Sequence, residues 1–263
     1  GLYNVCPIWL GYSERLLYLE EVVEVSVGLR VFMKRELPNK ELIEKFRGLP
    51  TANVADCMER LGVMSSEIRL LSNPSKKSMV GVALTVKVRN GDNLFIHQAI
   101  EMGGPGDVII VDNEGGRERS LAGAVMFGYC QYKGIEGLVI DGPIRDYDDV
   151  VESDWHIYAT GVTSRGPYKT GPGEVNVPIC CGGVVVNPGD IILGDMDGIL
   201  VIPKEDAERI LELAIPFAEK DASKTEKAIL GELDRSWVSK AIQDKKVEII
   251  DDVYKKGEVA FNI

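Results

Sequence analysis

The sequence has few histidines and cysteines, which limits the metal chemistry that it can support. His97 and His156 are the only histidines in 263 residues, and they form no His-x-x-x-His zinc motif. The five cysteines include no CxxC pair, and the adjacent Cys180 and Cys181 do not make a zinc knuckle. We therefore expect reduced, buried thiols and two structural histidines.

Long apolar runs and an excess of positive charge are also missing. No apolar run approaches the roughly 20 residues of a membrane span, and charged residues from Glu14 onward interrupt any secretory signal. Acidic residues outnumber basic ones by 41 to 30, giving a net charge of −11, the opposite of what phosphate-backbone binding favours. No Gly-x-Gly-x-x-Gly motif offers a nucleotide cradle. The sequence predicts a cytoplasmic protein with neither membrane nor nucleic acid as a partner.

Hydrophobic periodicity predicts strands that alternate with helices through the first 152 residues. The predicted strands are 24–33, 79–89, 107–112 and 138–141. The predicted helices are 40–46, capped by Asn39, then 51–60, 94–102, 121–133 and 146–152. This alternation indicates an α/β fold with buried, partly parallel strands.

The pattern changes after Tyr158. Short strands are predicted at 175–177, 183–186, 191–193 and 198–202, followed by a helix over 204–218 whose end Pro216 should kink. The charged tail is predicted to be mostly helical and to pack on a neighbouring molecule. We divide the chain into an N-terminal extension (1–47), an α/β domain (48–218) and a C-terminal helical arm (219–263).

Polar residues with possible chemical roles lie between the predicted strands 107–112 and 138–141 and directly after the second of these strands. Asp112 and Asp141 each end a hydrophobic strand, where ligands commonly bind in α/β sheets. Gly123 lies in the first turn of the predicted helix, so free N–H groups there could form an anion pocket; tight packing of an ordinary capped helix is the alternative. In Arg145-Asp146, the guanidinium suits a carboxylate or enolate and the carboxylate suits a magnesium-like ion, unless the two form an exposed ion pair.

Two further segments leave alternatives open. The loop 164–167 either lies on the surface or lines the site, in which case Arg165 could meet a second substrate carboxylate. Asp195-x-Asp197 lacks the remaining ligands of a calcium loop and is predicted to be a turn between strands.

Several motifs, in order, resemble the RraA-like family, which includes 4-hydroxy-4-methyl-2-oxoglutarate aldolases and regulators of RNase E activity. The resemblance covers about residues 48 to 233. The motifs are Gly91-Asp-Asn-Leu94, Pro105-Gly-Asp-Val-Ile-Ile-Val-Asp112, Gly134-x-x-Gly137, Asp141-Gly-x-x-Arg-Asp146, Val177-Pro178, Val186-Asn-Pro-Gly-Asp190 and Gly194-Asp-x-Asp-Gly198 with Pro203.

The resemblance implies an α-β-β sandwich of the swivelling type, assembled as a homotrimer or a dimer of trimers with active sites between subunits. It implies class II aldol chemistry on small 2-keto acids, or oxaloacetate decarboxylation, through a pyruvate enolate and without a covalent lysine intermediate. Asp146 would bind Mg²⁺ or Mn²⁺, and Arg145 would bind pyruvate and stabilise its enolate. The implied substrate-binding amides are those of Gly123, Ala124, Val125 and Met126.

One position departs from the family pattern. Active aldolases usually have an acidic residue directly after the glycine, separated from the Arg-Asp pair by twenty residues, and this chain has Ala124 there. That carboxylate normally holds a water near the metal and supports proton transfer. The candidates to replace it are Asp112, Glu114 and Glu118, or Asp221 and Glu226 from a neighbouring subunit.

Two other functions therefore stay open beside the lyase. One is a non-catalytic protein that inhibits RNase E by direct contact, for which the acidic charge would suit a basic partner surface. The other is a different small-molecule reaction, made possible by Ala124.

Overall fold

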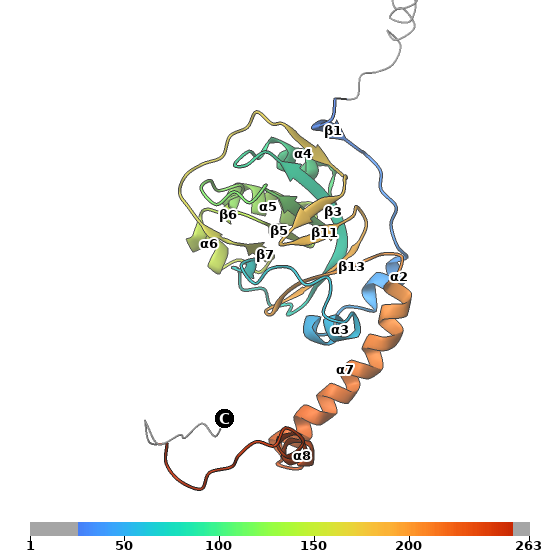
Figure 1. Cartoon of the computed structure of the whole chain (residues 1–263). Coiled ribbons are helices and arrows are strands. Elements are labelled where there is room, and N and C mark those ends of the chain that lie inside the picture. Colours follow the sequence, from blue (N-terminus) through green and yellow to red (C-terminus); the bar gives the residue numbers. More distant parts are fainter. Residues whose placement is uncertain (1–25, 255–263) are drawn as a thin grey trace, which may run out of the picture. The chain divides into compact units, whose positions relative to one another are not determined.

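The computed structural model describes residues 26–254, shown in Figure 1. Within them the chain forms two compact units, the second of which begins at Glu219. The start of the strand predicted at 24–33 lies outside the described residues, and its described part contains β1 (Leu29–Val31). No helix in residues 26–254 is long and apolar enough to cross a membrane.

A nine-stranded mixed sheet forms the centre of the first unit. Its order is β1-β9-β3-β4-β5-β7-β2. Strand β12 also pairs with β3, and β13 pairs with β12. The strands besides β1 are β2 (Arg69–Leu70), β3 (Met79–Val88), β4 (Asp107–Asp112), β5 (Gly137–Ile140), β7 (His156–Ala159), β9 (Gly173–Val175), β12 (Ile191–Asp195) and β13 (Gly198–Ile202). Strands β3, β4, β5 and β7 are parallel neighbours. Because Val86, Val111 and Ile140 lie side by side in this register, the carboxyl ends of these strands meet at one edge.

Helices cover one face of the sheet and a separate β-hairpin covers the other. On the first face, α4 (Leu94–Met102) and α5 (Ala124–Tyr132) pack against β4 and β5 through side chains such as Ile96 and Phe127. On the opposite face, the hairpin of β10 (Ile179–Cys181) and β11 (Val184–Val186) packs with β12 and β13. This order of layers confirms the predicted α/β fold.

The remaining elements surround these layers. They are α2 (Lys40–Glu44), α3 (Thr51–Cys57), β6 (Pro143–Ile144), α6 (Tyr147–Val151), β8 (Gly161–Val162) and α7 (Ala207–Ile229) in chain order, with α8 (Ser236–Asp244) in the second unit. Asn39 caps α2 as predicted, its side chain accepting a hydrogen bond from the Glu41 N–H at 2.8 Å. Helices α2, α3 and α7 form a separate core cluster with β12 and β13.

Several predicted boundaries were wrong, each for a local reason. The helix predicted from Leu121 begins only at Ala124, because the backbone at Gly123 is extended (φ −155°, ψ −175°). The strand predicted at 175–177 ends at Val175, since Asn176 has a φ of 58°. Helix α7 continues past Pro216 to Ile229 rather than ending near it. Pro216 is exposed, so water can bind the carbonyl that the missing N–H leaves free.

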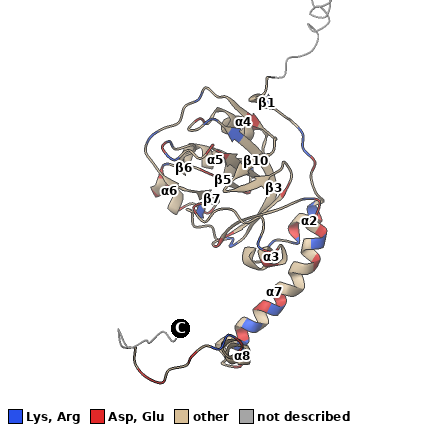
Figure 2. Cartoon of the chain, in the orientation of Figure 1, with Lys and Arg blue, Asp and Glu red and all other residues tan. Residues whose placement is uncertain are grey.

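The tail agrees with expectation over its described part, whereas the thiols differ in part. Within residues 219–254, the end of α7 and α8 together make up more than half of that stretch (Figure 2). Cys130 and Cys181 are buried, but Cys180 is exposed, because adjacent residues of strand β10 point to opposite faces. Cys6 lies outside the described residues.

Candidate active site

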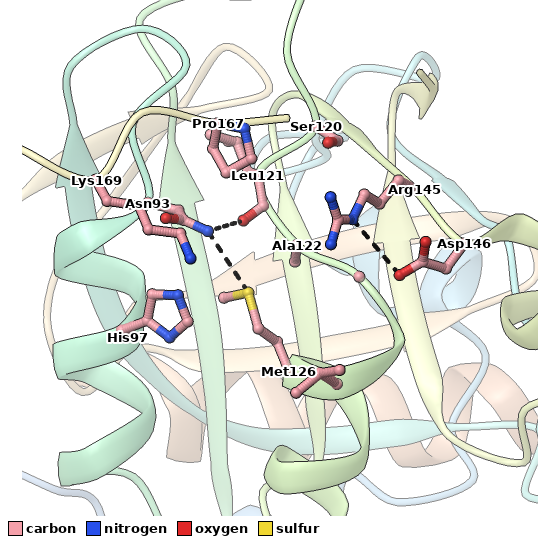
Figure 3. Close-up of a pocket in the computed structure, with 12 residues that line it drawn as sticks. Asn93, His97, Ser120, Leu121, Ala122, Met126, Arg145, Asp146, Pro167 and Lys169 are labelled. Carbon is pink, nitrogen blue, oxygen red and sulfur yellow. Dashed lines mark hydrogen bonds and ion pairs between the residues drawn. The ribbon is translucent and has the colours of Figure 1, made fainter. Parts of the chain in front are cut away.

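A cavity of about 240 Å³ opens at the carboxyl edge of the parallel strands, beside the start of α5. The turn after β3, the loop into α5, the segment after β5 and the loop after β8 all contribute to it (Figure 3). Its lining residues are Asn93, His97, Ser120, Leu121, Ala122, Gly123, Val125, Met126, Arg145, Asp146, Pro167 and Lys169. Arg145 and Asp146, predicted to be the centre of the chemistry, therefore line a cavity at this edge of the sheet.

Arg145 and Asp146 form one side of this cavity. The Arg145 N–H donates to the Ala122 carbonyl at 3.0 Å, which joins the segment after β5 to the loop that enters α5. Asp146 follows in the left-handed conformation (φ 60°, ψ 47°), a strained state for a residue other than glycine. The Arg145 Nε lies 3.6 Å from the Asp146 Oδ2, and the two side chains keep 49% and 35% of their surface exposed. Both groups can thus reach a ligand.

The start of α5 lies directly against Asp146. The Asp146 Oδ2 accepts a hydrogen bond from the Ala124 N–H at 2.9 Å. The Met126 N–H is also engaged, since it bonds the Gly123 carbonyl at 3.0 Å. Within the described residues, the N–H groups of Gly123 and Val125 have no acceptor. Of the four amides predicted to bind a carboxylate, two are therefore available in this conformation.

Gly123 is required by this close approach. A Cβ atom at Gly123 would lie 2.4 Å from the Asp146 Oδ2 and 3.0 Å from the Arg145 Cγ. A side chain there would displace Asp146 and Arg145, the two residues best suited to act on a substrate.

Asn93, His97 and Lys169 form the opposite side of the cavity (Figure 3). Asn93 donates from Nδ2 to the Leu121 carbonyl at 3.0 Å. Burial lowers the pKa of His97, and the nearby Lys169 ammonium lowers it further, against a smaller opposing effect of Glu101. The cavity thus has one side with Arg145 and Asp146 and another with two basic side chains.

Comparison with known proteins places this chain in a family. A family model described as RraA-like, Aldolase/RraA, matches residues 51–201. The chain belongs to the RraA-like family. A protein of Halalkalibacterium halodurans, provisionally named 4-hydroxy-4-methyl-2-oxoglutarate aldolase, is 41% identical over 174 residues, which are 66% of this chain and 82% of that protein.

Solved RraA structures share the fold. RraAS2 of Streptomyces coelicolor, described as an unusual member of the RNase ES inhibitor RraA family, superposes with a TM-score of 0.64 at 27% identity, covering 72% of this chain and 98% of that one. The RNA-processing inhibitor RraA of Thermus thermophilis gives a TM-score of 0.54 at 28% identity, covering 59% and 92%.

The loop after β8 lines the cavity through Pro167, which is one of the two alternatives left open for residues 164–167. Arg165 does not line the cavity; its guanidinium lies 3.5 Å from Glu118, and its carbonyl accepts from Ser120. Lys169, four residues later, does line it. Sequence reasoning missed Lys169 and treated His97 as structural, although His97 lies one helical turn from the Gly91-Asp-Asn-Leu94 motif that positions Asn93.

The acids considered as substitutes at Ala124 from the same subunit, Asp112, Glu114 and Glu118, do not line the cavity. Asp112 accepts from the Glu114 N–H at 2.9 Å, and Glu118 faces Arg165. A contribution of Asp221 or Glu226 from a neighbouring subunit stays a prediction. Asp146 is thus the only carboxylate among the cavity-lining residues of the described part of the chain.

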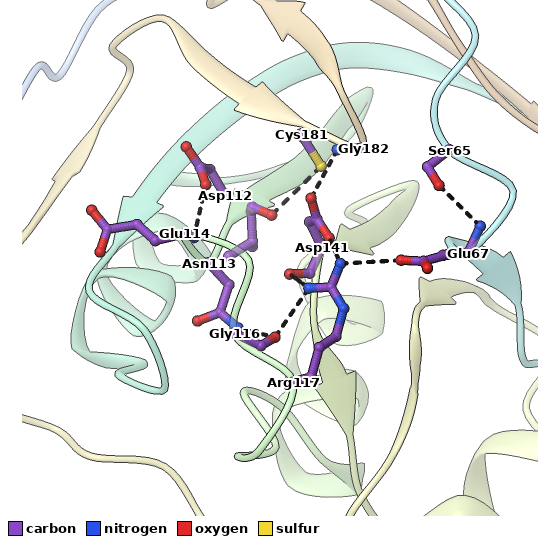
Figure 4. Close-up of polar contacts among 11 residues, drawn as sticks. Ser65, Glu67, Asp112, Asn113, Glu114, Gly116, Arg117, Asp141, Cys181 and Gly182 are labelled. Carbon is purple, nitrogen blue, oxygen red and sulfur yellow. Dashed lines mark hydrogen bonds and ion pairs between the residues drawn. The ribbon is translucent and has the colours of Figure 1, made fainter.

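Asp141 stabilises the surroundings of the site instead. It accepts from Arg117 at 2.8 Å and from the Gly182 N–H at 3.0 Å, which joins the loop after β4 to the β10–β11 hairpin (Figure 4). Asp195 likewise has a structural contact, because it accepts from the Thr51 N–H and hydroxyl at the β12–β13 turn. The predicted turn at Asp195-x-Asp197 is therefore confirmed.

The donor set around Asp146 fits one class of metal ion. No group of three or more His, Cys, Asp or Glu side chains is arranged as a metal site among residues 26–254. Mg²⁺ and similar hard ions usually keep several waters and need only one or two protein carboxylates. A half-exposed single carboxylate beside an open cavity suits such an ion rather than one held in a closed protein cage.

Proposed function

We propose that this protein is a divalent-metal-dependent lyase that breaks a carbon–carbon bond in small 2-keto acids. It would cleave 4-hydroxy-4-methyl-2-oxoglutarate in a retro-aldol reaction or decarboxylate oxaloacetate, in each case through a pyruvate enolate. The observation that carries the proposal is the position of Arg145 and Asp146 against the first turn of α5, in one cavity. The provisional name of the Halalkalibacterium halodurans relative supports it.

Each group in the site has a role in this chemistry. The free amides of Gly123 and Val125, at the positive end of the α5 dipole, would bind the substrate carboxylate. The guanidinium of Arg145 would donate to the 2-keto oxygen and stabilise its negative charge as the enolate forms. Asp146 would hold Mg²⁺ or Mn²⁺, which supplies Lewis-acid polarisation of the keto group when bound.

Ala124 affects the two reactions differently. Aldol cleavage requires a base to remove the proton of the 4-hydroxyl group, whereas decarboxylation releases carbon dioxide and needs only later protonation of the enolate. Asp146, the only acid on the cavity wall among residues 26–254, is already bonded to the Ala124 N–H. We therefore expect oxaloacetate decarboxylation to be faster than aldol cleavage.

The proposal is tested by following pyruvate from oxaloacetate and from 4-hydroxy-2-keto diacids, with Mg²⁺ or Mn²⁺ present. Asp146→Ala should lower kcat/KM by about 100-fold or more, because it removes a group that acts on the developing charge. Asp148→Ala, which removes an exposed acid two residues away, serves as the matched control and should leave the rate within about twofold. If the wild-type protein released no more pyruvate than Asp146→Ala, the lyase proposal would be wrong.

A second candidate is inhibition of an RNase E-type nuclease by direct contact. The similarity to RraAS2 and to the Thermus RraA favours it, and the net charge of −11 would suit a basic partner surface. The measurement is cleavage of an RNase E substrate at physiological salt with this protein in excess. Unchanged cleavage would eliminate this candidate, whereas inhibition by Asp146→Ala as strong as by wild type would separate it from the lyase site.

A further inference from the structure

We infer that His97 is the group that moves protons in the proposed lyase reaction. In aldol cleavage it takes the proton of the 4-hydroxyl group as the carbon–carbon bond breaks, and it then returns that proton to C3 of the pyruvate enolate. The inference rests on the proposed function, because it requires a 2-keto acid bound at Arg145. His97 would supply the base that Ala124 cannot provide.

The first observation is the position of His97 on the cavity wall. Helix α4 buries Ile96 and Ile100 against the sheet, so His97 lies on the side of the helix that faces away from this core. Figure 3 shows its ring on the side of the cavity opposite Arg145, and both residues line the cavity. A small ligand held at Arg145 therefore occupies the space that the ring borders.

The second observation is that the protein engages neither nitrogen of the His97 ring. The ring has no hydrogen bond to a described residue, and neither nitrogen is among the buried side-chain atoms that lack a partner, so both can meet a ligand. The other histidine differs in this respect. His156 is only 5% exposed and its Nε2 is buried, so no ligand can reach that atom.

Among the described residues, four other polar side chains on the cavity wall cannot act as the base. The Arg145 guanidinium and the Lys169 ammonium have no lone pair that could accept a proton. The Asn93 amide is not basic, and its Nδ2 already donates to the Leu121 carbonyl. The Ser120 hydroxyl is buried and donates to a backbone carbonyl at 3.0 Å. These groups can bind a ligand but are not free to take its proton.

Asp146 is the remaining candidate, and its contacts make it a poor base. Its Oδ2 accepts from the Ala124 N–H at 2.9 Å and lies 3.6 Å from the Arg145 Nε. In the proposed reaction the same carboxylate also holds the metal ion. Its lone pairs are then engaged by two kinds of partner, whereas those of His97 stay available.

The surroundings of His97 keep it in the form that accepts a proton. Burial lowers the pKa of His97, the Lys169 ammonium lowers it further, and Glu101 raises it by a smaller amount. Lys169 comes from the loop after β8, and Glu101 lies one turn further along α4. The ring is therefore neutral at neutral pH, and once it has taken a proton, its surroundings favour release of that proton. A group that acts first as a base and then as an acid needs both properties.

The cleavage reaction closes its proton balance through His97. The hydroxyl proton passes to the ring, the C3–C4 bonding electrons form the enolate, and the C4–O bond becomes a carbonyl. The imidazolium then protonates C3, so both products are released and the ring is neutral again. Decarboxylation of oxaloacetate needs no base, because carbon dioxide leaves first and water can protonate the enolate afterwards. It should therefore depend much less on His97.

The test is exchange of the methyl protons of pyruvate for deuterium, followed by NMR in D₂O with the full-length protein and Mg²⁺. In this reaction His97 would remove a proton from C3 and return a deuteron. His97→Gln keeps a polar side chain but cannot cycle a proton, so it should slow exchange by about 100-fold or more. Oxaloacetate consumption by the same variant should stay within about threefold, which also shows that its site is intact.

The pH dependence of exchange distinguishes proton transfer from a structural role. The wild-type rate should rise with pH through the pKa of His97, because only the neutral ring accepts a proton. Lys169→Met removes the cation that lowers this pKa, so the profile should move to higher pH. Glu101→Gln removes the carboxylate that raises it, so the profile should move to lower pH. A histidine with only a structural role gives no such opposite pair of shifts.

The outcomes separate this inference from the proposed function. If the wild-type protein consumed oxaloacetate no faster than Asp146→Ala, the proposed function would fail. If it consumed oxaloacetate but exchanged no pyruvate protons, or if His97→Gln exchanged them as fast as wild type, the role of His97 alone would be refuted. Equal losses of exchange and oxaloacetate consumption in His97→Gln would also refute it, and so would profile shifts in the same direction for the two charge variants.

Discussion

At the scale of single residues, the geometry depends on the close approach of Gly123 to Asp146. We predict that Gly123→Ala lowers kcat/KM for oxaloacetate by at least about tenfold, because the added Cβ would lie 2.4 Å from the Asp146 Oδ2 and force it away. The backbone at Gly123 is extended (φ −155°), so alanine should change the free energy of unfolding by less than about 1 kcal/mol. Steady-state kinetics and urea denaturation measure the two effects.

Gly104→Ala is the matched control for this substitution. A Cβ at Gly104 meets no atom within 4 Å, so the variant should keep both rate and stability. Equal rates for Gly123→Ala and wild type would mean that Asp146 can move without cost, and the site would then be less preorganised than its contacts indicate.

The sequence could predict one side of the cavity and not the other. Arg145-Asp146 was recognisable because a short motif contains it, and Gly123 because it lies in the first turn of a predicted helix. Lys169 approaches His97 only because the loop after β8 returns to the turn after β3, where the Asn93 N–H bonds the Tyr168 carbonyl at 3.0 Å. No spacing in the sequence encodes that contact, so the basic side of the cavity required the structure.

At the scale of elements, the turn after β3 controls the position of the loop after β8. Asp92 accepts the Thr170 and Gly171 N–H groups and also the Leu94 N–H at 2.9 Å. We predict that Asp92→Asn destabilises the protein by about 1–3 kcal/mol, because an amide NH₂ cannot accept from these buried donors.

Asp154→Asn provides the comparison for this change. Asp154 also accepts from a backbone N–H, that of Ser75, but the contact is exposed, so water can replace it at a cost of less than about 1 kcal/mol. Urea denaturation of the two variants measures how much each lowers the free energy of unfolding. Equal destabilisation by both would show that the contacts of Asp92 do not hold the loop.

The accuracy of the element predictions followed the strength of local patterns. The bounds of α4 and β4 matched the sequence prediction, because amphipathic periodicity and a continuous apolar run identify them without tertiary contacts. Strands β7 and β10 were missed, since three or four residues carry too little pattern and their pairing partners decide their structure. Pro216 was expected to kink the end of the helix, which is the usual effect of proline, but α7 continues past it because its exposed face tolerates proline.

At the scale of the whole molecule, the second unit has no core of its own. None of described residues 219–254 is buried, and several large apolar side chains there are more than 60% exposed. These are Ile229, Leu230, Trp237, Ile249, Ile250, Val253 and Tyr254. Apolar surface of this extent is unusual on a monomer and marks an interaction surface. We expect it to pack on other copies of the chain in a homotrimer or a dimer of trimers.

Removing the second unit tests this expectation. A chain that ends at Ala218 retains the α7 residues that are buried in the first unit, namely Ala207, Ile210, Leu211 and Ala214, so its circular dichroism spectrum should indicate a folded protein. Native mass spectrometry should show three or six copies for the full chain and mainly smaller species for the shortened one, because the apolar contacts are lost. Trp237→Glu, which adds charge to the same surface without shortening the chain, should shift the distribution in the same direction. A full-length protein that is monomeric at micromolar concentration would contradict the expectation, and so would a shortened chain that keeps its assembly.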